Sequence, residues 1–248
     1  MSTNIEDRSW RGPKASQRLA QVLARPILTG ALREGDRLPN EQEMMLRYEA
    51  GRPTVREALR LLETRGLIVL KSGPGGGPVV RHPRKDSLGE SLSLLLQIEG
   101  ASFGDVADAR RALEPMLARR AAERITAEQV VELDETVRLL RENPGDQQVF
   151  AVQNQRFHAV VAEAARSVVL DVFASSLKAL ADGVRVGVTY SARKQAAVAT
   201  AHEVIVAALR TGDPDAAEAA MREHLEEAER YWRRRYPDLM GRPVEWTY

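Results

Sequence analysis

The chain has 248 residues, of which 44% are hydrophobic and 29% charged, a composition typical of globular protein. This length suits one large domain or two modest ones, each with its own core. Cysteine is absent, which excludes disulfides, cysteine zinc fingers and thiol catalysis and fits a cytoplasmic protein. We find no run of about 18 apolar residues and no signal peptide, so we expect a cytoplasmic location and no membrane partner.

The small net charge of +1 conceals an asymmetry along the chain. Residues 1–85 carry 16 Lys and Arg against nine Asp and Glu, whereas the remaining residues carry 20 against 26. A basic first third joined to an acidic remainder indicates a nucleic-acid-binding module attached to a different kind of domain. Two solvated faces of unequal charge would give the same pattern.

The chain begins with two predicted helices. The first covers about 13–29; Gly30 ends it, and Pro26 should kink it or shift its boundary. Its apolar face is expected to consist of Leu19, Val22, Leu23, Ile27 and Leu28. Asn40 followed by Glu43 forms a capping-box pattern, which predicts a short second helix to about residue 48.

A third helix and a hairpin follow. Pro53 stands at a first helical position, and apolar residues keep helical spacing to about residue 65. The apolar run 67–70, the Gly- and Pro-rich turn 73–78 and a returning strand at 79–81 then predict a β-hairpin. A helix, a short helix, a turn, a helix and a hairpin in this order describe a winged helix-turn-helix, which we place at 10–82.

Residues 83–87 form a polar linker, and every strong pattern in 88–237 is helical. Helix starts are indicated by Ser102 with Asp105, Thr126 with Gln129, Asp146, and Asp213 with Pro214. We therefore predict a mainly α protein, in which an all-α bundle of six or seven helices follows the N-terminal winged helix-turn-helix.

The segment 51–62, GRPTVREALRLL, has the residue types of a DNA-reading helix. Arg52, Thr54 and Arg56 would lie at or near its N-terminal end, which is the end that enters the major groove. Arginine can pair with guanine O6 and N7, and threonine can contact a base edge or a phosphate. Taken alone, the segment is better explained as a surface helix with scattered arginines.

Residues 14–81 resemble the DNA-binding domain of the GntR family of regulators. The matching segments are ILTGALREGDRLPNEQE (27–43) and RPTVREALRLLETRGLI (52–68), with turn, recognition helix and wing in the family's order. The resemblance implies a homodimer that binds a pseudo-palindromic double-stranded DNA operator. It implies DNA contacts from Arg37, Gln42, Arg52, Thr54, Arg56 and Gly73.

Two positions depart from the family pattern. Gln42 stands where many relatives carry arginine, and Gly51 stands where serine or threonine usually caps the recognition helix. Gln42 has no charge for a phosphate, so the base preference or the affinity at that contact is expected to differ.

Three of the four histidines, His158, His202 and His224, lie in the acidic region. Asn154 precedes His158 by four residues, so the two side chains would share one helix face. Metal sites need nitrogen and oxygen donors that converge from separate elements, and these separations are too long to indicate convergence. From the residues alone, each histidine is better explained as a hydrogen-bonded structural residue.

Residues 88–232 resemble the helical FCD effector domain of the FadR subgroup of GntR regulators. The matching segments are DARRALEPMLARRAAERIT (108–126), NQRFHAVVAEAA (154–165), AHEVIVAALRTGD (201–213) and AAMREHL (219–225). The resemblance implies a divalent metal ion, with zinc or nickel expected, held by Asn154, His158, His202 and His224. It also implies a small carboxylate effector anchored by the metal and by Arg110, the arginine of the family's Arg-x-x-Leu-Glu motif.

One departure lies after the His158 helix, where Arg166-Ser167 replaces a Gly-Asn pair common in the family. We expect it to change a turn rather than the site. The segment SLGESLSLLLQIEG (87–100) predicts an additional helix and favours the seven-helix FadR type. The effector-binding and dimerisation domain is accordingly expected at 88–237.

These observations favour a non-enzymatic, metabolite-responsive regulator, a repressor more often than an activator. A metalloenzyme domain fused to a DNA-binding module is the alternative, because three histidines with an open coordination position can activate water. No carboxylate at a defined spacing offers a general base for it. A third possibility is an architectural DNA-binding protein whose helical domain only dimerises, but the four candidate ligands would then have no role.

Overall fold

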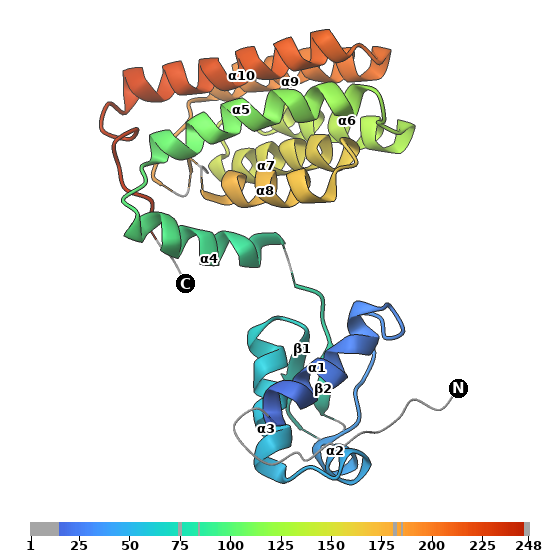
Figure 1. The fold of residues 1–248 in the computed structure, drawn as a ribbon. Coiled ribbons are helices and arrows are strands. Elements are labelled where there is room, and N and C mark those ends of the chain that lie inside the picture. Colours follow the sequence, from blue (N-terminus) through green and yellow to red (C-terminus); the bar gives the residue numbers. More distant parts are fainter. Residues whose placement is uncertain (1–14, 74–75, 84, 181–182, 185, 246–248) are drawn as a thin grey trace. The chain divides into compact units, whose positions relative to one another are not determined.

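The structure, a computed structural model, describes residues 15–73, 76–83, 85–180, 183–184 and 186–245. The chain divides into two compact units, Met1–Arg84 and Lys85–Tyr248 (Figure 1). Helices dominate the described residues, and one two-stranded sheet lies in the first unit, so the predicted mainly α fold is confirmed. In the described part of the chain no helix combines the length and the apolar character needed to span a bilayer.

The first unit is built on the predicted three helices, α1 (Ala15–Leu28), α2 (Glu41–Tyr48) and α3 (Arg52–Thr64). Its core comes mainly from α1 and α3, which pack on each other through apolar residues at helical spacing: Leu19, Leu23, Ile27, Val55, Leu59 and Leu62. The expectation for Leu28 was wrong, because this side chain is 73% exposed. Positions 19, 23 and 27 already form one stripe, and residue 28 lies beside it on the helix surface.

A small hairpin completes this unit. Strands β1 (Ile68–Lys71) and β2 (Gly77–Val80) pair antiparallel, with Ile68 opposite Val80. The backbone N–H of Leu38 donates to the carbonyl of Pro78 (3.0 Å), which joins the segment before α2 to the hairpin. Residues 74–75 of the predicted turn lie outside the described residues.

The described residues of the second unit form seven helices, the larger of the two predicted numbers. They are α4 (Lys85–Ile98), α5 (Phe103–Ala122), α6 (Ala127–Glu142), α7 (Gln147–Ala164), α8 (Val168–Leu180), α9 (Ala192–Thr211) and α10 (Pro214–Arg235). The predicted caps Ser102, Thr126, Asp146 and Asp213 each accept a hydrogen bond from a backbone N–H in the first turn. These helices therefore begin where the local sequence places them.

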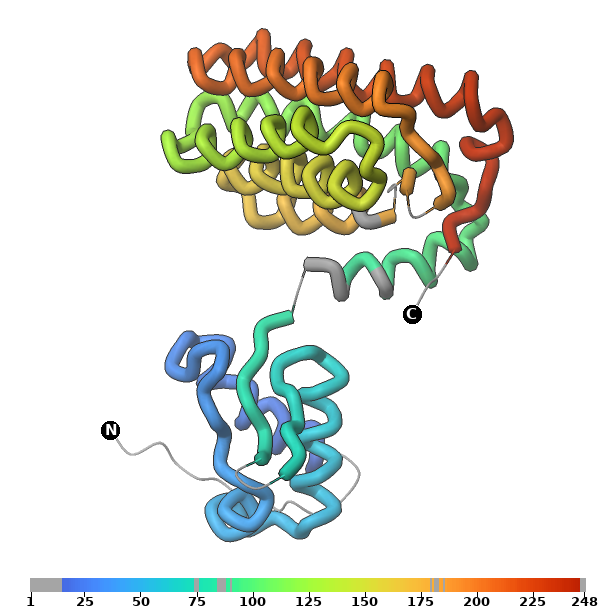
Figure 2. The backbone as a smooth tube through the Cα atoms, turned by 180° about the vertical axis from the view of Figure 1, so that it is seen from behind, coloured from blue at the N-terminus to red at the C-terminus, as the bar shows by residue number. Residues whose placement is uncertain are grey.

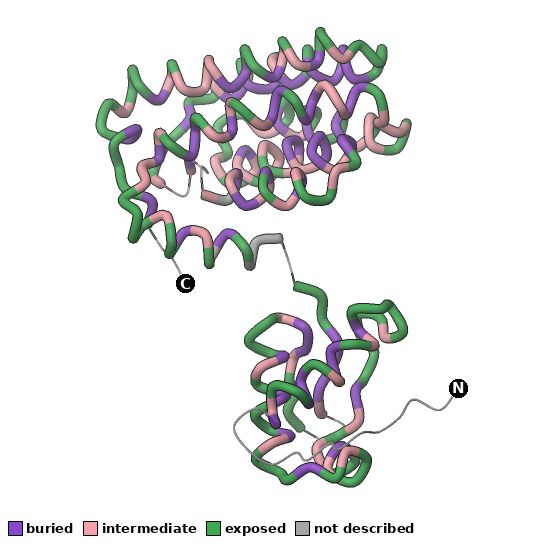
Figure 3. The backbone as a smooth tube through the Cα atoms, viewed as in Figure 1, coloured by how far each residue is buried: buried purple, intermediate pink, exposed green. Residues whose placement is uncertain are grey.

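Helix α5 is central to this unit, because it packs against α7, α8, α9 and α10. Helices α9 and α10 run side by side in both views, and α6 contacts α7 and α9 (Figures 1 and 2). Buried residues follow the inward faces of these helices (Figure 3). The core around them contains Phe157, Ile205, Leu209 and Met221.

After α10 the chain returns to the start of α5. Leu239, Met240 and Val244 are buried, although they follow residue 237, the predicted end of the domain. The backbone N–H of Phe103 donates to the carbonyl of Arg242 (2.8 Å), which fixes this return. The terminal segment therefore closes one end of the bundle.

Candidate metal centre and nucleic-acid interface

Three histidines that are distant in sequence meet inside the helical unit. His158 lies on α7, His202 on α9 and His224 on α10, and one ring nitrogen of each lies within 4.8 Å of the others. The Nε2 atoms of His158 and His224 are 3.3 Å apart. All three side chains are buried. The packing of these three helices therefore brings the histidines together, which their separations in the sequence could not indicate.

The ring of His202 is held by stacking rather than by hydrogen bonds from the described residues. Neither of its ring nitrogens has a hydrogen-bond partner among the described residues, and the residue is 0% exposed. Its ring instead stacks on Phe157, with centroids 3.7 Å apart and planes 6° from parallel. A buried polar atom without a hydrogen-bond partner lowers the stability of the fold by about 1–3 kcal/mol. A ligand that binds the ring nitrogen would remove this penalty. A cation bound between the histidines would be such a ligand.

A buried carboxylate lies beside the histidines. Glu114 Oε1 accepts a hydrogen bond from Arg110 Nε (2.5 Å), and Glu114 Oε2 lies 2.5 Å from His158 Nδ1. The second contact is close but is not aligned as a hydrogen bond. Sequence reasoning assigned no role to Glu114. The signal was present, since Glu114 follows Arg110 by four residues and is the glutamate of the Arg-x-x-Leu-Glu motif.

Burial keeps the three imidazoles neutral. It lowers the pKa of His158 to about 4, although the nearby Glu114 carboxylate opposes this shift. Burial, reinforced by the neighbouring histidines, holds the pKa values of His202 and His224 well below their ordinary range. For Glu114, burial acts to raise the pKa, but the charge of Arg110 and the contact with His158 hold it well below its usual value. At neutral pH the site thus offers uncharged imidazoles, the form that binds metals.

The donor set fits a divalent transition metal. Imidazole nitrogens suit zinc, nickel, copper and iron. In a tetrahedral site with bonds of about 2.0–2.1 Å, two nitrogens lie about 3.3–3.4 Å apart, which matches the 3.3 Å between His158 and His224. Asn154, the fourth predicted ligand, lies one helical turn before His158 on α7 and is half-buried. Arg110 is buried beside the site through its bond to Glu114.

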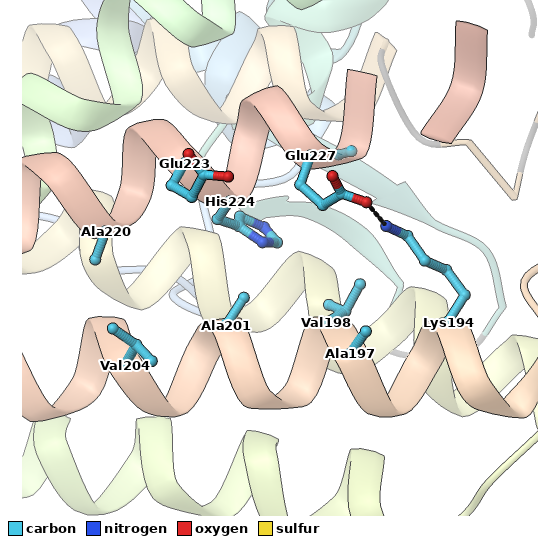
Figure 4. A pocket seen from close by; sticks show the side chains of 10 residues that line it. Lys194, Ala197, Val198, Ala201, Val204, Ala220, Glu223, His224 and Glu227 are labelled. Atoms are coloured by element: carbon cyan, nitrogen blue, oxygen red, sulfur yellow. Dashed lines mark hydrogen bonds and ion pairs between the residues drawn. The ribbon is translucent and has the colours of Figure 1, made fainter. Parts of the chain in front are cut away.

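A groove between α9 and α10 reaches His224 from the surface. Its volume is about 190 Å³, and its walls are mainly small apolar residues such as Ala201 and Ala220. His224 extends from α10 toward α9 in this groove, and an ion pair between Lys194 and Glu227 (3.2 Å) lies at one end (Figure 4). The groove therefore borders the histidine cluster at His224.

Three of the predicted DNA-reading side chains lie at the start of α3. Arg52 and Arg56 are exposed at the start of α3, with Thr54 half-buried between them. Gly51 caps α3 without a side-chain hydrogen bond, as its residue type predicts. Glu41 of α2 lies 4.0 Å from Arg52 and 3.8 Å from Arg56, a neighbour that sequence reasoning did not consider.

The remaining predicted contacts lie outside α3. Gln42 is exposed in the first turn of α2. Arg37 is exposed and pairs through its backbone with Val79 of β2. Gly73 follows β1 in the wing and has a φ of 94°, a left-handed conformation that favours glycine.

Comparison with known proteins yields matches in both units. Residues 15–76 match the family model of bacterial regulatory proteins of the gntR family, and residues 105–227 match that of the FCD domain. The chain is 30% identical over 230 residues to the HTH-type transcriptional repressor NanR of Cronobacter sakazakii, which covers 88% of this chain and 85% of the relative. NanR of Klebsiella aerogenes is 30% identical over 246 residues, covering 94% and 91%. A solved structure, Streptococcus agalactiae GntR, aligns with a TM-score of 0.68 at 26% identity, covering 87% of this chain and 99% of that one.

Proposed function

Because this chain belongs to the GntR family of bacterial regulators and combines its helix-turn-helix with an FCD domain, we propose that it is a metabolite-controlled transcriptional repressor. Its operator affinity is set by a small carboxylate that binds beside a divalent metal ion. The observation that carries this proposal is the buried cluster of His158, His202 and His224 with the arginine–glutamate pair next to it. The name of the NanR relatives supports repression rather than activation.

In this proposal the first unit reads DNA, and the second unit senses the effector and dimerises. The predicted linker 83–87 overlaps the first turn of α4, which begins at Lys85. Two copies of the chain bind a pseudo-palindromic operator, since a two-fold dimer presents two equivalent recognition helices. Arg52 and Arg56 contact bases or phosphates from the start of α3. Arg37, Gln42, Thr54 and Gly73 contribute the flanking contacts. Exposure of both arginines supports this assignment.

In the sensing unit, His158, His202 and His224 hold the metal, and Asn154 supplies an amide oxygen. The bound metal supplies an uncompensated positive charge to which a carboxylate coordinates. An amide leaves that charge at +2, whereas an aspartate would reduce it to +1. Arg110 lies beside the cluster; because Glu114 balances its charge, in this proposal it offers the same anion guanidinium N–H donors rather than excess charge. The site therefore favours a carboxylate effector. Zinc or nickel suits its donors.

An enzymatic role is less well supported. Hydrolysis at a metal centre needs a carboxylate or histidine free to accept a proton. Glu114 lies against His158, but it is paired with Arg110 and its pKa is held low, so it is a weak base. The NanR relatives are named as transcriptional repressors. We therefore assign no catalytic residue.

The proposal is tested by selecting bound sequences from random DNA with the purified chain and then measuring operator affinity under three conditions: with EDTA, with added zinc or nickel, and with metal plus a panel of small carboxylates. We expect a pseudo-palindromic consensus and at least one carboxylate that changes operator affinity only when metal is present. Sequence-independent binding would overturn the DNA assignment. An unchanged affinity across metals and acids would overturn the sensing assignment.

A further inference from the structure

Glu114 bridges the two parts of the sensing site. One carboxylate oxygen is bonded to Arg110, and the other touches His158. We propose that Glu114 is a positioning residue, which fixes the proton of His158 on Nδ1 and so directs the lone pair of Nε2 toward the metal. This inference rests on the metal site of the proposed function and assigns it a residue outside the four ligands.

The tautomer follows from the distance between the two atoms. Glu114 Oε2 and His158 Nδ1 are 2.5 Å apart, and both side chains are about 95% buried, at 5% and 4% exposed. If Nδ1 carried a lone pair, it would face a carboxylate lone pair at this distance with no water to separate them. Electrostatic repulsion therefore disfavours that form, and the proton stays on Nδ1.

The opposite ring nitrogen is then correctly placed. Nε2 of His158 faces the cluster, at 3.3 Å from Nε2 of His224. With the proton held on Nδ1, Nε2 keeps the lone pair that a metal ligand needs. A carboxylate that orients a histidine from behind is a general feature of metal sites, and it also makes the imidazole a better donor.

Arg110 keeps Glu114 in place and ionised. Its Nε–H donates to Glu114 Oε1 over 2.5 Å, and the four-residue spacing puts both side chains on one face of α5. His202 is held differently, because its ring is oriented by its stack on Phe157. Glu114 thus acts on one of the three histidine ligands.

The decisive variant is Glu114→Gln. Its single oxygen will pair with the charged Arg110, because charge-assisted hydrogen bonds are the stronger ones. The amide NH₂ then faces His158 Nδ1, which must become the acceptor, and the proton moves to Nε2. The tautomer is read by ¹⁵N NMR of histidine-labelled, EDTA-treated full-length protein, with the His158 signals assigned by their loss in His158→Gln.

We expect wild type to show the proton on Nδ1 of His158 and Glu114→Gln to show it on Nε2. In parallel, calorimetric titration with zinc alone should show affinity reduced about 10–100-fold in Glu114→Gln. Asp108→Asn is the matched control, because Asp108 is an exposed acid on the same helix that pairs with Arg111. This control should leave both readouts unchanged.

The outcomes separate the two proposals. If wild type binds no divalent ion, the metal site of the proposed function fails, but the tautomer measurement still tests Glu114. A proton on Nε2 of His158 in wild type would overturn the positioning role, even if Glu114→Gln did not fold. The positioning role would also be overturned if Glu114→Gln weakened metal affinity while the proton stayed on Nδ1 of His158. Glu114 would then act on the metal only through its charge.

Discussion

The ring of His202 lies flat against the ring of Phe157, with 3.7 Å between the centroids. This stack orients a candidate ligand that has no hydrogen bond among the described residues. Phe157 is itself 0% exposed and belongs to the main core of the helical unit. A single core residue therefore both stabilises the bundle and sets the geometry of the site.

Phe157→Leu should separate these two roles. The loss of ring contacts should lower the free energy of unfolding by about 0.5–3 kcal/mol. Without the stack, His202 can turn, so zinc affinity measured by calorimetry should fall as well. Phe103→Leu is the control, because Phe103 packs edge-on against Trp232 in another core cluster. Phe103→Leu should lower the free energy of unfolding by a similar amount and leave zinc affinity unchanged. Equal losses of zinc affinity in the two variants would contradict the role of the stack.

The metal-free protein should lose stability as the pH falls. The pKa of His158 is about 4 in the fold, below its ordinary 6.5, so the unfolded chain takes up this proton first. The stability that neutral His158 contributes is fully present above about pH 6.5 and is lost as the pH falls from there to about 4. The lowered pKa values of His202 and His224 act in the same direction. Urea midpoints in EDTA at pH 7.5, 6.5 and 5.5 measure the loss.

His202→Leu should make this pH dependence shallower, since leucine has no proton to bind. Ile205→Leu, an apolar exchange on the same helix that removes no titratable group, should leave the slope unchanged. An identical slope in wild type and His202→Leu would contradict the burial of a neutral histidine at this position.

Much of the fold could be predicted because it is encoded locally. The capping boxes at Asn40, Ser102 and Thr126 set three helix starts from residues three positions apart. The histidine cluster could not be derived in this way, because it depends on how α7, α9 and α10 pack. Only the family resemblance named those histidines together. Glu114 was missed because its partner His158 lies on another helix.

Arg52→Ala and Arg56→Ala should each weaken operator binding by about 1–3 kcal/mol if the side chains contact bases. Contacts limited to phosphate would instead weaken all sequences alike and reduce the salt dependence. Fluorescence anisotropy with operator and scrambled DNA at several salt concentrations distinguishes the two cases. Arg81→Ala removes one exposed charge of the same unit, at a residue with no assigned contact, and serves as the comparison for charge. Unchanged binding in both α3 variants would refute the recognition-helix assignment.

Asn154→Asp should strengthen metal binding and weaken the carboxylate's contribution. A carboxylate is a better donor than an amide, and it removes one unit of the positive charge that attracts the effector. In wild type the metal and the acid should each raise the other's affinity, a coupling that calorimetry measures as a ratio of dissociation constants. This ratio should move toward one in Asn154→Asp. A larger ratio would mean that the acid is not attracted by the site's charge.

Native mass spectrometry of the purified full-length chain tests the central claim most directly, because one spectrum reports the assembly, the metal and any retained acid. We predict a dimer that carries one divalent ion per chain, and a small acid that is lost when EDTA removes the ion. Three substitutions, His158→Ala, His202→Ala and His224→Ala, should each deplete the metal without dissociating the dimer. A metal-free monomer that gains no ion on addition of zinc or nickel would contradict the account.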